Sequence, residues 1–149
     1  AWEWTERRWR AVSLRANSIG AYFAMLAVDR LDRALLVSPI LDMEGLILTM
    51  MGWAGVTEEE LRERGEIAAS FGQTLSWEYL CWVREHPVHS WNCPVRILYG
   101  SEDSMTPRRT VEEYVRRHGA RLTVLEGGEH WLHTPEQLSA LREWEEREA

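Results

Sequence analysis

The sequence predicts an α/β protein built on a mostly parallel sheet flanked by helices. Three observations lead to this fold class. A strand, a helix and a second strand follow one another within residues 11–37, which is a βαβ unit and requires parallel strands. The strand-then-helix order returns in residues 94–119 and again in residues 121–149. The composition is that of a globular chain, with 45% hydrophobic and 28% charged residues among 149.

The first βαβ unit begins with a strand over residues 11–14, a short apolar run that ends in a turn-like segment at residues 16–18. Apolar residues then recur at helical spacing over residues 19–29. A buried strand over residues 34–37 completes the unit. Ahead of it, residues 2–9 place three tryptophans among charges and look like the end of a helix.

Residues 41–93 carry no convincing strand pattern and are predicted to be a helical insertion. Thr57 and Glu60 form a capping box that opens a short helix, and Gly65 closes it. Residues 76–85 predict a second helix that carries several aromatic side chains.

The sheet pattern returns with a strand over residues 94–100. Thr106, which is followed by proline, is expected to cap the next helix, and Gly119 ends it. A strand over residues 121–125 precedes the last helix. A capping box with a proline at the first helical position opens that helix at residues 134–137.

Charge and composition exclude several classes of protein. The net charge of −7 argues against a nucleic-acid partner. The longest apolar stretches, such as residues 34–41, are well short of the ~18 residues needed to cross a bilayer. Cys81 and Cys93 are too few for a disulfide framework and predict reduced thiols in a cytoplasmic protein. His86 and His89 lack the further ligands that a zinc site needs, so no metal is expected.

Ser18 lies at the junction of the first strand and its helix, within Ala16-Asn17-Ser18-Ile19-Gly20. A serine between small residues at such a turn is typical of a nucleophile elbow. The sharp turn exposes the hydroxyl and directs the next backbone N–H, that of Ile19, at a developing oxyanion. The pattern departs from that motif at Ala16, where glycine is usual. An ordinary helix-capping serine fits the same five residues, so the motif alone leaves both interpretations open.

Asp103 and His130 directly follow the third and fourth strands. Taken singly, they fit a turn acid and a surface-loop histidine. Together with Ser18 they share one edge of the sheet, because the carboxyl ends of parallel strands meet there. Open α/β sheets place their sites at this edge, and the three residues occur in the order Ser, Asp, His.

With these motifs the chain resembles, over essentially all of its 149 residues, the carboxyl-terminal part of an α/β-hydrolase-fold serine hydrolase. It looks most like the group of cytosolic lysophospholipases, monoglyceride lipases and serine aminopeptidases. The resemblance implies that Ser18 is the nucleophile, that His130 is the general base and later acid, and that Asp103 orients the imidazole. It implies no metal and no organic cofactor. Glu102 and His133 are the neighbouring competitors, and the motif positions favour Asp103 and His130.

The resemblance also assigns the organisation of the chain as a single domain. The elbow strand, its helix and the next strand occupy residues 1–40. A helical cap insertion occupies residues 41–93. The acid loop, the histidine loop and the last helix occupy residues 94–149.

The predicted activity is hydrolysis of a carboxylic ester with a small or medium apolar acyl group through an acyl-serine intermediate. The expected partner is therefore a small-molecule ester. The apolar residues of the cap either form its own small core or line an acyl pocket, in which case Trp53, Trp77 and Trp82 contact the substrate. The alternative is a truncated, non-catalytic module that needs a partner or an amino-terminal segment.

This alternative arises from strands that the resemblance leads one to expect ahead of the elbow strand. The loop that supplies the second oxyanion donor lies among those strands, and nothing in residues 1–10 resembles it. The strand over residues 11–14 is then an exposed edge with unpaired N–H and C=O groups. We therefore expect that the chain either self-associates through this exposed elbow strand or represents part of a longer hydrolase.

Overall fold

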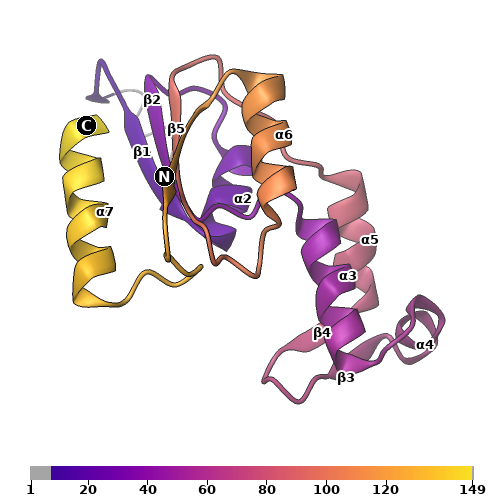
Figure 1. Cartoon of the computed structure of the whole chain (residues 1–149). Helices are drawn as coiled ribbons and strands as arrows, with labels where there is room; N and C mark the ends of the chain where they lie inside the picture. Colours follow the sequence, from indigo (N-terminus) through magenta and orange to yellow (C-terminus); the bar gives the residue numbers. More distant parts are fainter. Residues whose placement is uncertain (1–7, 149) are drawn as a thin grey trace. The chain divides into compact units, whose positions relative to one another are not determined.

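A computed structural model describes residues 8–148 of the chain (Figure 1). The chain forms two compact units. The first consists of Ala1–Leu41 together with Val88–Ala149, and the second of Asp42–Pro87. The helix end expected within residues 2–9 falls largely outside the described residues.

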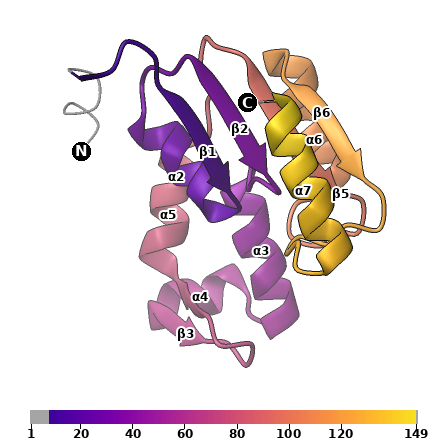
Figure 2. The same ribbon diagram turned by 90° about the vertical axis from the view of Figure 1, so that its left-hand side faces the viewer.

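The first unit is built on a parallel sheet whose strands lie in the order β1-β2-β5-β6 (Figure 2). All three strand pairs are parallel. The predicted α/β fold class with a mostly parallel sheet flanked by helices is therefore confirmed. The elements of this unit are β1 (Ser13–Asn17), α2 (Ile19–Ala27), β2 (Arg33–Val37), β5 (Val95–Gly100), α6 (Arg108–His118), β6 (Arg121–Leu125) and α7 (Pro135–Glu148).

The two faces of this sheet are covered by different helices. Figure 1 shows α2 and α6 on one side of the sheet and α7 on the other. Side chains alternate across a strand, so Ala34 and Leu36 join the core that includes Met25 of α2 and Val111 of α6. Their neighbours on β2 point the other way, to a smaller core around Trp144 of α7. Within residues 8–148, α7 is the one helix on this second face.

Strand β1 is an edge of the four-stranded sheet, with β2 as its only neighbour among the described residues. On the face that α7 covers, Arg15 and Asn17 of β1 are exposed. The Arg15 guanidinium reaches Glu145 of α7 at 2.7 Å. The edge expected for the first strand is thus present.

The second unit contains α3 (Met43–Ala54), α4 (Glu58–Arg64) and α5 (Trp77–Glu85) together with a short antiparallel pair, β3 (Glu66–Ala68) and β4 (Thr74–Ser76). The capping box of Thr57 and Glu60 and the closing Gly65 are confirmed. The β3–β4 hairpin differs from the prediction, because residues 41–93 were expected to be entirely helical. Strands of three residues are too short to show an alternating pattern.

Helix α6 begins differently from the prediction. Its N-cap is Pro107, and no side chain caps it. Thr106 instead donates its hydroxyl to the Pro39 carbonyl at 3.1 Å, so the prediction of Thr106 as the capping residue is wrong. Gly119 ends the helix as expected, in a left-handed conformation with φ 67°. The capping box at residues 134–137 is confirmed at the start of α7.

Three further properties hold for the part of the chain that the structure describes. None of its helices is both long and apolar enough to cross a membrane. Within residues 8–148, no three histidine, cysteine, aspartate or glutamate side chains are grouped to hold a metal ion. Cys81 and Cys93 are free thiols, and burial raises the pKa of Cys93, with a further rise from the nearby Asp32 carboxylate.

Candidate active site

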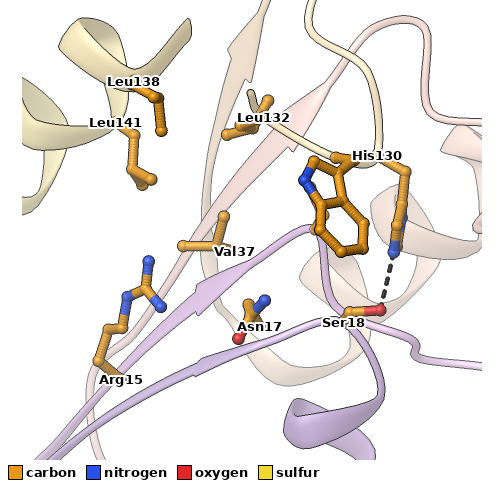
Figure 3. Close-up of a pocket in the computed structure, with 10 residues that line it drawn as sticks. Arg15, Asn17, Ser18, Val37, His130, Leu132, Leu138 and Leu141 are labelled. Atoms are coloured by element: carbon orange, nitrogen blue, oxygen red, sulfur yellow. Dashed lines mark hydrogen bonds between the residues drawn. The ribbon is translucent and has the colours of Figure 1, made fainter. Parts of the chain in front are cut away.

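Ser18 occupies a strained turn between β1 and α2, with φ 50° and ψ −130°. A non-glycine residue in such a conformation costs on the order of 1–3 kcal/mol and is found mainly where function requires it. The hydroxyl caps no helical N–H. It lies instead 2.8 Å from Nε2 of His130 (Figure 3). The structure thus decides against the helix-capping interpretation of Ser18.

His130 is held between Ser18 and Asp103. Its Nδ1 lies 2.8 Å from Oδ2 of Asp103, whose side chain is fully buried. The other carboxylate oxygen of Asp103 accepts the backbone N–H groups of Met105 at 2.8 Å and Thr106 at 3.1 Å. Both oxygens are therefore engaged, and these hydrogen bonds orient the carboxylate toward the imidazole.

The loops that carry Asp103 and His130 touch through two glycines. A Cβ built on Gly100 would lie 2.2 Å from the carbonyl oxygen of Gly128, so no larger residue fits there. The Glu102 N–H donates to that same carbonyl at 2.8 Å. Ser101 accepts the Gly127 N–H at 2.8 Å. This close backbone contact sets the distance between the acid and the imidazole.

Tyr99 stabilises the loop that carries Asp103 through a hydrogen bond. Its hydroxyl is buried and donates to the Thr106 carbonyl at 2.9 Å. Burial raises the pKa of Tyr99, and the nearby Asp103 carboxylate raises this pKa further. The phenol therefore stays protonated and keeps donating throughout the neutral pH range.

The two competitors named from the sequence do not join this arrangement. Glu102 is exposed on the loop beside Asp103. The His133 side chain is more than half exposed, and its Nδ1 lies 3.3 Å from the Glu129 carboxylate. Asp103 and His130 are thus the residues that the fold brings to Ser18.

A pocket of about 270 Å³ lies beside Ser18 on the face of the sheet that α7 covers. Figure 3 shows Leu138 and Leu141 on a helix across from Val37 and Arg15 on the strands. The lining of this pocket combines apolar and polar side chains. The apolar ones are Val37, Trp131, Leu132, Leu138 and Leu141, and the polar or charged ones are Arg15, Asn17, Ser18, Ser38 and His130.

The sequence analysis missed most of these lining residues. Trp131 is 77% exposed, and a large apolar side chain directly after a candidate histidine was a signal that could have been used. Leu138 and Leu141 lie three apart on α7, which was predicted only from the capping box and the proline at its start.

Trp53, Trp77 and Trp82, predicted to contact substrate, belong to the second unit, whereas every residue that lines the pocket at Ser18 belongs to the first. Trp53 is exposed, and its ring meets Phe71 edge-on at 6.1 Å. Trp82 is also exposed and stacks on Tyr79 at 6.0 Å. Their contact with a substrate stays a prediction.

The turn at Ser18 differs in one detail from the expectation that both flanking positions must be small. Ala16 is buried beneath the turn and fits that expectation. At Gly20, however, an added Cβ would meet no described atom within 4 Å. Gly20 is exposed in the first turn of α2, so a larger side chain has room there.

The fold and this geometry define an α/β protein whose parallel sheet and flanking helices match α/β-hydrolase structures over part of their length. No protein-family model and no curated protein matches the chain. Solved structures do match. Est1E from Butyrivibrio proteoclasticus, solved with ferulic acid bound, is 19% identical with a TM-score of 0.72 and covers 96% of this chain. Alpha/beta hydrolase domain-containing protein 10 from mouse is 17% identical with a TM-score of 0.65 and covers 88% of this chain.

A further match is an alpha-beta serine hydrolase homologue from Coxiella burnetii, at 19% identity, with a TM-score of 0.54 and 95% of this chain covered. At these identities the likeness establishes the fold. The chain spans only part of each relative, namely 63% of Est1E, 58% of the mouse protein and 51% of the Coxiella protein.

Proposed function

We propose that the chain carries the catalytic residues of a serine hydrolase that cleaves a carboxylic ester through an acyl-serine intermediate. The observation that supports this most strongly is the hydrogen-bonded series from Ser18 to His130 to Asp103, with both distances 2.8 Å. The strained backbone at Ser18 supports it as well, because the strain holds the hydroxyl out of the helix and toward the imidazole.

Ser18, His130 and Asp103 each have a separate role in the proposed reaction. Because Asp103 accepts the proton on Nδ1 of His130, Nε2 is the free acceptor for the Ser18 hydroxyl proton. As Oγ attacks the ester carbonyl, that proton moves to Nε2 and the carbonyl electrons move to oxygen. The imidazolium then protonates the leaving alcohol, and an acyl-serine remains. Water, deprotonated by His130, releases the acid and restores Ser18.

The N–H of Ile19 is the proposed oxyanion donor. It belongs to the first turn of α2, where helical N–H groups have no acceptor within the helix. A site with this donor alone turns over about 10²–10³-fold more slowly than one with two. This is the basis of the alternative proposal, a partial module that reaches full activity only with a partner or a further segment.

The apolar wall beside Ser18 fits an ester with a small or medium apolar acyl group. Est1E was solved with ferulic acid bound, which makes aromatic acyl esters a reasonable first panel for this chain. We further propose that the insertion of residues 41–93 acts as a cap and that Trp53, Trp77 and Trp82 contact the acyl group.

Ser18→Ala tests the proposed function most directly. We expect a fluorophosphonate to add one covalent group to the wild-type chain, measured by intact-protein mass, and none to Ser18→Ala, because the attacking oxygen is gone. Ser139→Ala is the matched control, since Ser139 is an exposed serine on α7. A wild-type chain that stays unmodified, or equal labelling of Ser18→Ala, contradicts the proposal.

Self-association through β1 is proposed on the basis of its open edge. Unpaired strand groups favour pairing with a second copy, and a lysine on the edge opposes this. We expect light scattering to report a mass above that of one chain for the wild type, and a lower mass for Ser13→Lys. The same charge change at the exposed Asn92 is the control. A wild-type chain that remains a monomer with a cooperative melt would falsify this proposal.

A further inference from the structure

Ser38 is the first residue after β2, one strand away from Ser18. Its N–H donates to the Leu98 carbonyl of β5 at 2.8 Å, and the Ser18 N–H donates to the Val37 carbonyl at 3.0 Å. Ser38 therefore stands next to Ser18 along the carboxyl edge of the sheet. Both residues line the pocket described above.

Two properties make Ser38 unusual. Its backbone has φ 43°, and Ser18 and Ser38 are the two non-glycine positions with positive φ among the described residues. Its side chain is 98% buried, and its hydroxyl has no hydrogen-bond partner among the described residues. An alanine would avoid the cost of burying this unpaired hydroxyl, so the hydroxyl lowers stability where it stands.

The order of the strands determines where Ser38 lies relative to the imidazole of His130. The imidazole of His130 contacts Ser18 after β1 on one side and Asp103 after β5 on the other. Strand β2 lies between β1 and β5. Ser38 directly follows β2. It therefore lies between the strand end that carries Ser18 and the strand end that carries Asp103, the two residues that the imidazole contacts. No other hydroxyl side chain follows β2 directly.

We infer that Ser38 is a positioning residue that supports His130 during acylation, an inference that rests on the proposed function. When the Ser18 proton moves to Nε2 and Oγ bonds to the acyl carbon, a positive charge appears on the imidazole. A hydroxyl without a fixed partner rotates its lone pairs toward that charge. Ser38 thereby stabilises the charged imidazole without contacting the substrate, and its oxygen neither gains nor loses a proton.

Two variants, Ser38→Ala and Ser38→Gly, separate this role from a structural one. Both remove the hydroxyl, whereas only glycine also removes the backbone strain. Both ring nitrogens of His130 are already engaged, so Ser38 can meet the charged ring only through a weak C–H···O contact. We expect both variants to lower the maximal rate of fluorophosphonate labelling to a similar extent, about 2- to 5-fold, which is the size of one such contact. The probe concentration that gives half the maximal rate is expected to stay the same. Melting temperatures are expected to rise for Ser38→Ala, which loses the unpaired buried hydroxyl, and to rise further for Ser38→Gly, which also loses the backbone strain.

The control is Ser90→Ala, which removes another buried hydroxyl that does not line the pocket. It is expected to label at the wild-type rate. If Ser38→Gly labels as fast as the wild type, or if labelling follows the melting temperature across the variants, the role of Ser38 is refuted while the proposed function stands. If the wild-type chain itself does not label, the proposed function fails and the inference fails with it.

Discussion

Asp103→Asn is expected to lower the rate of fluorophosphonate labelling by about 10⁴-fold, the loss typical of a Ser-His-Asp triad whose acid becomes an amide. The amide oxygen can still accept the N–H groups of Met105 and Thr106, so the loop keeps its geometry. The amide nitrogen then donates to Nδ1 of His130. This places the ring proton on Nε2, where it blocks acceptance of the Ser18 proton.

Glu102→Gln is the matched control for this change, because it makes the same acid-to-amide replacement one residue away on an exposed side chain. Its labelling rate is expected to equal that of the wild type. Thermal melting of both variants checks that the fold persists. A large loss in Glu102→Gln with a small loss in Asp103→Asn would mean that the acid has been assigned to the wrong residue.

Gly100→Ala is expected to lower the free energy of unfolding by about 3 kcal/mol, the upper part of the range for overpacked positions. The new Cβ would lie 2.2 Å from the Gly128 carbonyl oxygen and 2.8 Å from that of Glu129. Both are backbone atoms, so relief requires the histidine loop to move as a whole. Urea denaturation measures the stability, and covalent labelling measures the expected loss of the Ser18–His130 contact.

Gly52→Ala makes the same chemical change where an added Cβ meets no described atom within 4 Å. Gly52 lies inside α3, and alanine favours a helix by about 0.8–1.0 kcal/mol over glycine, so stability is expected to stay equal or rise. Gly100→Ala with wild-type stability and wild-type labelling would show that the two loops are not held by this close contact.

The sequence was sufficient to predict the parallel sheet, because the central strands β2 and β5 are apolar runs stopped by turn residues. The first strand lies over Ser13–Asn17 and not over residues 11–14 as predicted, because Arg15 and Asn17 of this edge strand are exposed and interrupt the apolar pattern. Burial on both faces produces such runs in β2 and β5, and helices that follow them in sequence require parallel pairing. The edge position of β1 and the meeting of Ser18, Asp103 and His130 follow from that topology. Their roles in catalysis remain proposals.

Features that depend on contacts between residues far apart in the chain could not be predicted from the sequence. Thr106 has the local pattern of a capping residue, but its hydroxyl bonds to Pro39, which is 67 positions away. The closeness of Gly100 and Gly128 is likewise a contact between separate loops. Ser38 gave no signal either, since its unpaired hydroxyl is apparent only once the surrounding residues are placed.

The second unit is inserted between β2 and β5, which are adjacent strands paired from Ala34 and Val95 onward. The sheet therefore fixes the distance between the two strands that the insertion connects. The entropy of closing such a connection grows only slowly with its length, by about 0.6 kcal/mol for each doubling of a flexible loop. Residues 42–87 are consequently the segment in which length and sequence can diverge most freely, while the sheet keeps Ser18, His130 and Asp103 in register.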